Sequence, residues 1–161
     1  MVPNKMPHNI HEVLQHVYNL VSAEVKQGIK IENDYDPSIP LINIDRDLLV
    51  QAVLNITRNA VKAIGETGSV IFKTRILRHY TIAKKFNKLV ACISIIDDGP
   101  GIPEEITSQI FFPMVSGQND GTGLGLAISQ LLINQHDGSI EFDSKPGRTE
   151  FRILLPIEMK I

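Results

Sequence analysis

The sequence predicts an α/β fold: a two-layer sandwich in which a mixed, mostly antiparallel sheet is covered on one face by about three helices. Three segments carry apolar residues at the helical period, and the segments between and after them alternate apolar and polar residues as strands do. Strand pairs follow the second and third helices, an order that suits helices on one face of a mixed sheet. The 161 residues fit one domain, which we expect to span residues 10–161 after a disordered segment at residues 1–9.

The predicted helices occupy residues 10–26, 46–64 and 124–136. In the first helix, apolar residues recur at intervals of three and four, and Gly28 follows its end. Asp45 or Asp47 can cap the second helix, which ends before Gly65.

Strands are predicted in residues 29–40, where a loop with two prolines follows the strand, and in residues 68–77, 88–97, 138–144 and 149–156. The second and third of these form a hairpin. We expect its tip to be solvated, or alternatively to dock a regulatory protein, and it carries His79, Lys84, Lys85 and Lys88. Residues 98–122 are too long for an ordinary connection, so we expect them to be functional or mobile.

Composition excludes several functional classes. The net charge of −2 gives the chain as a whole no electrostatic footprint for nucleic acid or an anionic membrane. The only cysteine, Cys92, excludes an internal disulfide, and its alternating strand predicts that it is buried. No apolar run approaches the roughly 20 residues that span a bilayer, and the first residues lack the apolar region of a signal peptide. We therefore expect a cytoplasmic protein.

A polar stripe follows one face of the second predicted helix. Asn55, Arg58, Asn59 and Lys62 have the spacing i, i+3, i+4, i+7, so they share that face. The stripe holds two amides and two cations but no acid. Amide oxygens suit Mg²⁺ and cations suit phosphates. The alternative is an ordinary solvated helix face.

A short turn, "DDGPGIP", follows a strand that we expect to be buried. Gly99 and Gly101 let the backbone turn sharply and let a flat ligand approach closely. The carboxylate of Asp97 can accept a hydrogen bond from an amino group such as that of adenine. An ordinary Asp-Gly turn is the alternative, and the spacing lacks the acidic positions of an EF-hand calcium loop.

A second glycine-rich turn, "GTGLGLAIS", opens the third predicted helix. Gly121, Gly123 and Gly125 alternate, which is neither a dinucleotide fingerprint nor a Walker A loop. The first N–H groups of a helix that begins at Leu124 have no helical partner and can bind phosphate. A hinge before a packed helix is the alternative.

Together these stretches resemble the ATP-binding catalytic domain of sensor histidine kinases, a member of the Bergerat-fold group with gyrase, Hsp90 and MutL. The order of "NITRNAVKAI", "DDGPGIP", "IFFPM", "GTGLGLAIS" and "PGRTEF" over residues 47–151 is similar to the N box, first glycine box, F box, second glycine box and last glycine–threonine segment. The sequence in and around the last three motifs is most similar to that of the NtrB group of nitrogen-regulation kinases.

This resemblance implies ATP and Mg²⁺ as cofactors and assigns a role to each motif. It makes Asn59 the Mg²⁺ ligand, places Asn55 in the site and directs Lys62, and Arg58 as a weaker case, to phosphate. It implies an adenine contact by Asp97, with Gly99, Gly101 and Thr149 beside it. It also implies a lid at residues 99–122, anchored by Phe111 and Met114, whose end lies along the triphosphate at Gly121, Thr122, Gly123, Leu124 and Gly125.

Two residues depart from the family pattern. Ala63 stands where many relatives carry an aromatic residue that stacks on adenine. Arg148 stands where relatives often carry glycine, which leaves the nucleotide contact of that strand open.

The resemblance also bears on the reaction. ATPases of this group carry a glutamate at the position of Asn55, and an amide cannot act as a general base. Phosphoryl transfer is therefore favoured over hydrolysis. His11-Glu12 lacks the Asn-Pro of the kinase phosphoacceptor motif, so we expect the acceptor histidine on a separate dimerisation domain.

The implied partners are that domain, an NtrC-type response regulator and a PII-type signal protein, with the isolated domain a monomer. The alternatives are a Bergerat-fold ATPase, an anti-sigma-type serine kinase module, and a binding module that holds nucleotide without catalysis.

Overall fold

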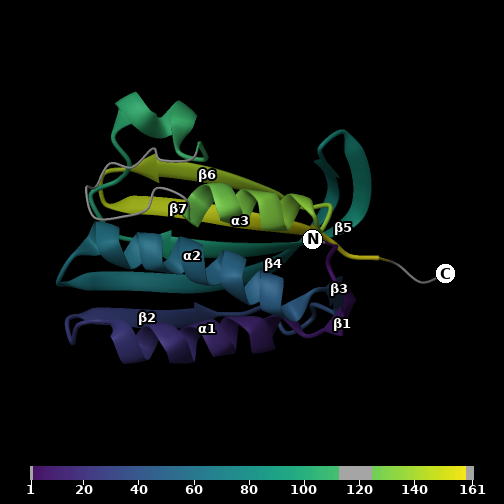
Figure 1. Cartoon of the computed structure of the whole chain (residues 1–161), viewed down its shortest axis with the longest axis horizontal. Coiled ribbons are helices and arrows are strands. Elements are labelled where there is room, and N and C mark those ends of the chain that lie inside the picture. Colours follow the sequence, from purple (N-terminus) through teal and green to yellow (C-terminus); the bar gives the residue numbers. More distant parts are fainter. Residues whose placement is uncertain (1, 113–124, 159–161) are drawn as a thin grey trace.

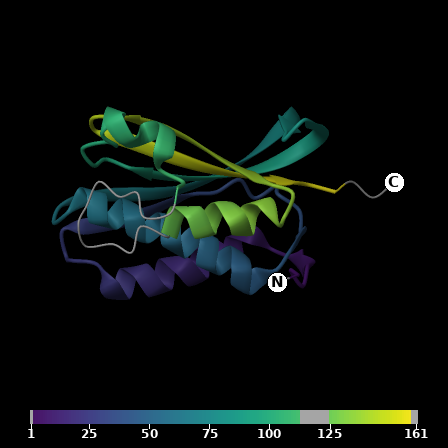
Figure 2. The ribbon, with the colours of Figure 1, turned by 45° about the horizontal axis from the view of Figure 1, so that its top comes forward.

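The computed structural model describes residues 2–112 and 125–158. The elements, in chain order, are β1 (Met6–His8), α1 (Ile10–Glu24), β2 (Ile29–Asp34), β3 (Ile42–Ile44), α2 (Arg46–Ile64), β4 (Gly68–Ile82), β5 (Lys85–Asp97), the 3₁₀ helix η1 (Glu104–Gln109), α3 (Gly125–Asn134), β6 (Ser139–Lys145) and β7 (Arg148–Pro156). They form two layers, with α1, α2 and α3 side by side over one face of a sheet (Figures 1 and 2).

The main sheet has five strands in the order β2-β4-β5-β7-β6. β2 runs parallel to β4, and every other neighbouring pair is antiparallel. The predicted two-layer sandwich with a mixed, mostly antiparallel sheet is thereby confirmed. The predicted order of elements also holds, apart from the short strands β1 and β3 and the 3₁₀ helix.

The core lies between the helices and the inner face of the sheet. Side chains alternate across a strand, so Phe72, Ile93 and Phe151 point toward the helices and are buried. The outer face carries charged side chains as well as apolar ones. There Arg152 lies 2.8 Å from Asp143, and no described helix covers this face.

Capping sets the ends of α2. The side chain of Asp45 accepts the backbone N–H of Leu48 at 3.3 Å, which satisfies one of the unpaired donors of the first turn. Asp45, and not Asp47, is therefore the N-cap. Gly65 follows the helix with a φ of +86°, a conformation that glycine adopts readily.

The expectation that residues 1–9 are disordered is wrong for Met6–His8. These residues form β1, which pairs with β3 in an antiparallel register of Met6 opposite Ile44 and His8 opposite Ile42. The N–H of Asn4 also donates to Asp45 at 2.9 Å. Backbone pairing with a distant strand supplies the order, and three residues are too few to show a strand period in the sequence.

The hairpin is longer than predicted. β4 and β5 continue to a turn at Ala83 and Lys84, whose φ angles of +47° and +70° are those of a tight two-residue turn. The predicted loop therefore consists mostly of strand. A small apolar cluster separate from the main core joins the hairpin to β7, and in it Ile82, Val90, Cys92 and Leu154 are buried.

Phe151 is the centre of an aromatic group beneath η1. It stacks on Phe142 at 5.7 Å between ring centroids and meets the edge of Phe111 at 6.4 Å. Phe151→Ala is expected to lower the free energy of unfolding by about 3–5 kcal/mol, because it leaves a cavity in the core. Phe86→Ala is the matched control, since Phe86 is 58% exposed. Denaturant unfolding measures both, and equal effects would contradict this description of the core.

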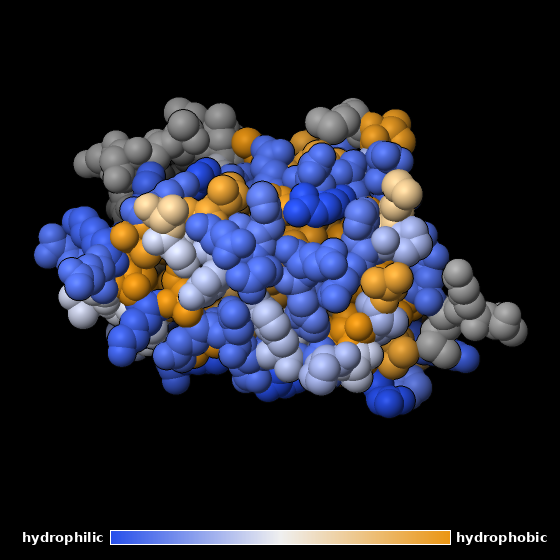
Figure 3. All heavy atoms as spheres, turned by 90° about the horizontal axis from the view of Figure 1, so that it is seen from below, coloured by the Kyte–Doolittle hydropathy of each residue, from blue (hydrophilic) through white to orange (hydrophobic). Residues whose placement is uncertain are grey.

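The third helix, α3, is described from Gly125, so the predicted start at Leu124 lies outside the described residues. In the described ranges, no helix combines the length and apolarity needed to cross a membrane. Figure 3 shows the α1 and β2 edge of the molecule as a mostly hydrophilic surface with apolar side chains scattered between.

Candidate nucleotide-binding site

Asp97 lies at the end of β5, directly opposite Thr149 of β7. Cross-strand neighbours project to the same face of a sheet, so both side chains point toward the helix layer. Both residues are only 3% exposed. The sheet register therefore brings together two predicted adenine-site residues that are 52 positions apart in the chain.

The carboxylate of Asp97 is only partly satisfied. Its Oδ1 accepts the N–H of Gly99 at 2.9 Å, and among the described residues Oδ2 has no hydrogen-bond partner. Burial raises the pKa of Asp97, the Gly99 hydrogen bond lowers it, and the neighbouring Asp98 raises it, with a net upward shift. A carboxylate of a buried residue that keeps one oxygen without a described partner is suited to accept a hydrogen bond from a ligand.

The turn after β5 packs tightly against neighbouring backbone. A Cβ on Gly99 would lie 2.9 Å from the Asp97 carboxylate, and a Cβ on Gly101 would lie 2.9 Å from the backbone of Lys145. Gly101 also has a φ of +90°. The glycines predicted for close approach are thus required by this turn itself.

Hydrogen bonds fasten this turn to the β6–β7 hairpin. The N–H of Gly147 donates to the carbonyl of Gly99 at 2.9 Å. Ser144 Oγ accepts the N–H of Ile102 at 2.8 Å and lies 2.8 Å from Thr149 Oγ1. Thr149 is therefore held in place through Ser144.

α2 carries the other half of the site. Asn55 is half-buried and donates through Nδ2 to the carbonyl of Gly125, the first residue of α3, at 3.5 Å. Asn59 and Lys62 are exposed further along the helix. The carbonyl of Ala63 lies beside Gly99. Asn55 and Ala63 are eight residues apart, about 12 Å along the helix axis, so α2 connects the start of α3 to the turn beside Asp97.

The structure gives Arg58 a partner that the sequence did not indicate. Its guanidinium forms a two-pronged ion pair with Glu24 of α1, at 3.2 Å from Nε and 2.5 Å from Nη2. The pair raises the pKa of Arg58 and lowers that of Glu24. Arg58 is thus directed toward α1 and its charge is matched there, which favours Lys62 over Arg58 as the phosphate contact.

Phe111 lies where the predicted lid leaves the body of the protein. Its ring packs edge-on against Phe142 and Phe151 at 6.0 and 6.4 Å. The remaining predicted lid residues lie outside the described residues: Met114, Gly121, Thr122, Gly123 and Leu124.

Residues 44–159, more than half of the chain, match the family of histidine kinase-, DNA gyrase B- and HSP90-like ATPases. The chain belongs to this family. The resemblance inferred from the motif order is therefore confirmed.

Within this ATPase family the chain is similar to histidine kinases. It is 48% identical over 155 residues to the sensory histidine kinase/phosphatase NtrB of Vibrio alginolyticus, which covers 95% of this chain and 44% of that protein. The chain thus spans less than half the length of the curated relatives that it matches.

Two solved histidine kinases share the fold. The catalytic domain of ThkA has a TM-score of 0.81 at 26% identity, with 96% of each chain covered. ThkA in complex with the response regulator TrrA has a TM-score of 0.76 at 25% identity, with 96% of this chain and 42% of that chain covered. Full-length ShkA in complex with AMPPNP has a TM-score of 0.83 at 28% identity, with 99% of this chain and 32% of that chain covered.

Sequence reasoning missed three residues that hold predicted site residues in place. Ser144 links Thr149 to the glycine turn, and Phe142 supports Phe111. Their signal was the alternation of β6, which places residues 142 and 144 on the inner face. Glu24, the partner of Arg58, had no such signal because 34 residues separate the two in the chain.

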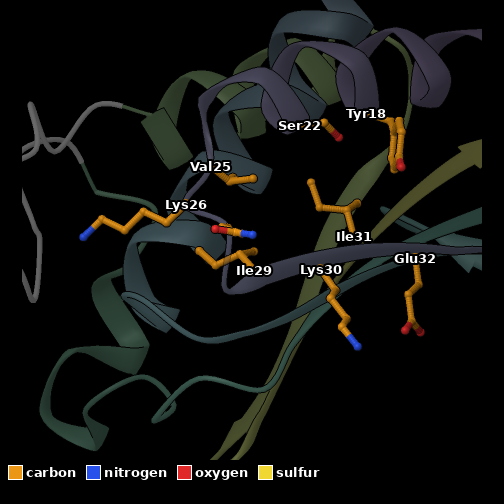
Figure 4. Close-up of a pocket in the computed structure, with 9 residues that line it drawn as sticks. Tyr18, Ser22, Val25, Lys26, Ile29, Lys30, Ile31 and Glu32 are labelled. Atoms are coloured by element: carbon orange, nitrogen blue, oxygen red, sulfur yellow. The ribbon is translucent and has the colours of Figure 1, made fainter.

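Two grooves lie beside α1 on the described surface. One, of about 430 Å³, lies between α1 and β2, where Ile31 points toward the helix while Lys30 and Glu32 point away from it (Figure 4). None of the predicted nucleotide-binding residues is among the described residues that line it. A smaller groove of about 210 Å³, between α1 and α2, is lined in part by Arg58 and Lys62.

Two cations of α2 are expected to differ in their effect on nucleotide affinity. Arg58→Ala is expected to leave ATP affinity within about twofold and to remove an exposed ion pair that contributes about 0.3–1 kcal/mol to stability. Lys62→Ala is expected to lower the affinity for ATP by about tenfold, because a charge-assisted contact to phosphate is lost. Calorimetric titration of both variants with ATP decides this. A larger loss of ATP affinity for Arg58→Ala than for Lys62→Ala would instead make Arg58 the main phosphate contact.

Proposed function

We propose that this chain is the ATP- and Mg²⁺-binding catalytic domain of an NtrB-like histidine kinase, which supplies the γ-phosphate to a histidine on a separate dimerisation domain. The observation that carries the proposal is the position of Asp97. Its buried carboxylate lies beside Thr149 and two required glycines, at one end of the helix that bears Asn55, Asn59 and Lys62.

The residues present fit an adenine nucleotide. The Asp97 oxygen without a described partner would accept the adenine amino group, and Gly99 and Gly101 allow the tight turn that holds this carboxylate in place. Stacking on adenine is expected to be weak, since Ala63 offers a methyl group where relatives have an aromatic ring. Lys62 would face the phosphates, and Gly125 would lie at their far side next to Asn55.

The residues also fit a magnesium ion bound through phosphate. The described residues hold no group of three or more histidine, cysteine or acidic side chains that could bind a metal. Mg²⁺ is commonly held by few protein oxygens together with substrate phosphates and water. The exposed amide oxygen of Asn59 would be such a ligand, and the bound ion would neutralise charge on the phosphates.

Asn55 favours transfer over hydrolysis. Its amide donates to the carbonyl of Gly125 and, unlike a carboxylate, cannot take a proton from water. The domain would therefore orient the triphosphate and exclude water from it, while the attacking nucleophile comes from the acceptor histidine. The lid at residues 99–122 is described only to Phe112 and stays a prediction.

The proposed partners follow from the NtrB-like assignment. They are the phosphoacceptor dimerisation domain, an NtrC-type response regulator and a PII-type signal protein, in the cytoplasm where ATP is available. The complex of ThkA with TrrA supports a response regulator as a partner of this kind of domain. A monomeric state of the isolated domain stays a prediction.

Measuring ATP binding and phosphate release on the same sample tests this proposal against a hydrolase. We expect saturable Mg²⁺-dependent binding of ATP with no phosphate release above the uncatalysed background. Steady release of phosphate by the chain alone would indicate an ATPase and contradict the proposal.

A further inference from the structure

α2 and α3 are joined by a line of three polar contacts that starts at the proposed nucleotide site. Asn55 Nδ2 donates to the carbonyl of Gly125 at 3.5 Å, and Ser129 Oγ donates to the carbonyl of Ala52 at 2.9 Å. Numbers rise along α3 as they fall along α2, so the two helices run antiparallel in one fixed register. We call this line of contacts the α2–α3 seam.

His136 forms the third contact, at the end of the seam farthest from the nucleotide. It is 3% exposed. Its Nε2 accepts the backbone N–H of Asp45 at 3.0 Å, and its Nδ1 donates to the carbonyl of Leu132 at 2.7 Å. Both ring nitrogens are used, one as an acceptor and one as a donor, so the partners select the neutral imidazole with its proton on Nδ1.

The same end of the seam holds the N-terminal segment. Asp45 caps α2 and also accepts the N–H of Asn4 at 2.9 Å. Lys5 lies 3.5 Å from the carboxylate of Asp137, the residue after His136. His136 therefore fastens the end of α3 to the start of α2 at the point where residues 4–8 dock on the domain.

We propose that His136 is a positioning residue for the nucleotide site: by binding the N–H of Asp45 it fixes the register of α3 against α2, and so places Gly125 and Asn55 about 15 Å away. Two packed helices whose polar contacts are in register shift together when one end is released. The inference rests on the proposed function for its effect on affinity, but its effect on the helices can be measured without nucleotide.

Two amide substitutions separate the two ring nitrogens. In His136→Gln the amide oxygen can reach the position of Nε2 and accept the Asp45 N–H. In His136→Asn the shorter amide reaches only the position of Nδ1. We expect His136→Asn to weaken ATP–Mg²⁺ binding about 2- to 30-fold, and His136→Gln to stay near the parent. Ile93→Val, a core change away from the seam, controls for loss of stability alone.

The test combines calorimetric titration with amide hydrogen exchange in the nucleotide-free protein. In His136→Asn, exchange is expected to speed up in Gly125–Ser129, at the far end of α3, while Ile93→Val leaves it unchanged. If the parent binds ATP and both His136 variants bind ATP as tightly as the parent does, the inference is overturned. If the parent binds no ATP, the proposed function fails, and unchanged exchange in Gly125–Ser129 would then overturn the inference separately.

Discussion

Asp97→Asn is expected to weaken ATP binding by about 10- to 150-fold, which is the loss expected for one hydrogen bond to a charged group. The amide oxygen would continue to accept the N–H of Gly99, so the amide NH₂ would take the place of Oδ2 and face the adenine amino group. Two donors would then oppose each other. Inorganic tripolyphosphate has no base, so its binding is expected to change little.

The same substitution is expected to leave the protein at least as stable as the parent. Burial holds the pKa of Asp97 above its ordinary value, so the folded protein binds this proton more tightly than the unfolded chain does. Folding therefore carries a penalty at neutral pH that fades as the pH falls through the raised pKa toward the ordinary one. Asparagine carries no charge, so the variant lacks this penalty and its pH dependence.

Asp98→Asn is the matched control for Asp97. Asp98 accepts the N–H of Ser69 at 2.9 Å, a bond that an asparagine oxygen can keep, and its side chain is exposed. Calorimetry with ATP and with tripolyphosphate compares the two variants. Equal losses for both ligands in Asp97→Asn would break the adenine assignment.

Asn59→Ala is expected to abolish the part of ATP affinity that depends on Mg²⁺. The affinity of the variant with Mg²⁺ should fall to the value measured with a chelator, a loss of about tenfold or more. Phosphoryl transfer should fall further, since the ion stabilises charge on the transferring group.

Gln51→Ala provides the control for this second prediction. Gln51 is an exposed amide on the same helix, two turns before Asn59 and outside the proposed metal position. The Gln51→Ala variant should bind ATP with the same affinity as the parent, with and without Mg²⁺. An undiminished Mg²⁺ effect in Asn59→Ala would sink the metal assignment.

The layers and the helices could be predicted because their signals are local. The helical period of α1 and α2, the apolar run of β5 and the alternation of β7 are visible within single segments. β1 and β3 could not be predicted, since each has three residues and exists only by pairing with the other. The length of the hairpin was underestimated because its outer residues are mostly polar and were interpreted as a loop, although the strands continue to a two-residue turn.

Site residues were predictable where a short motif fixes the local backbone. They were less predictable where contacts between distant segments set the direction of a side chain. Gly99 and Gly101 lie within four residues of Asp97 in the same turn, so the motif alone predicts their roles. Arg58 shares a helix face with Asn55 by spacing, but the position of Glu24 on α1 depends on how two helices pack, and this pairing redirects the guanidinium. Helix spacing places a side chain on a face without showing which neighbour it meets.

Transfer of labelled phosphate from ATP to a separate helical-hairpin domain that bears the acceptor histidine tests the central claim most directly. The account predicts an acid-labile, alkali-stable label on that histidine, present with the parent chain and with Gln51→Ala and strongly reduced with Asn59→Ala. A label on serine would instead indicate an anti-sigma-type kinase. Tight ATP binding with no label on any residue would contradict the account and leave a nucleotide-dependent binding module.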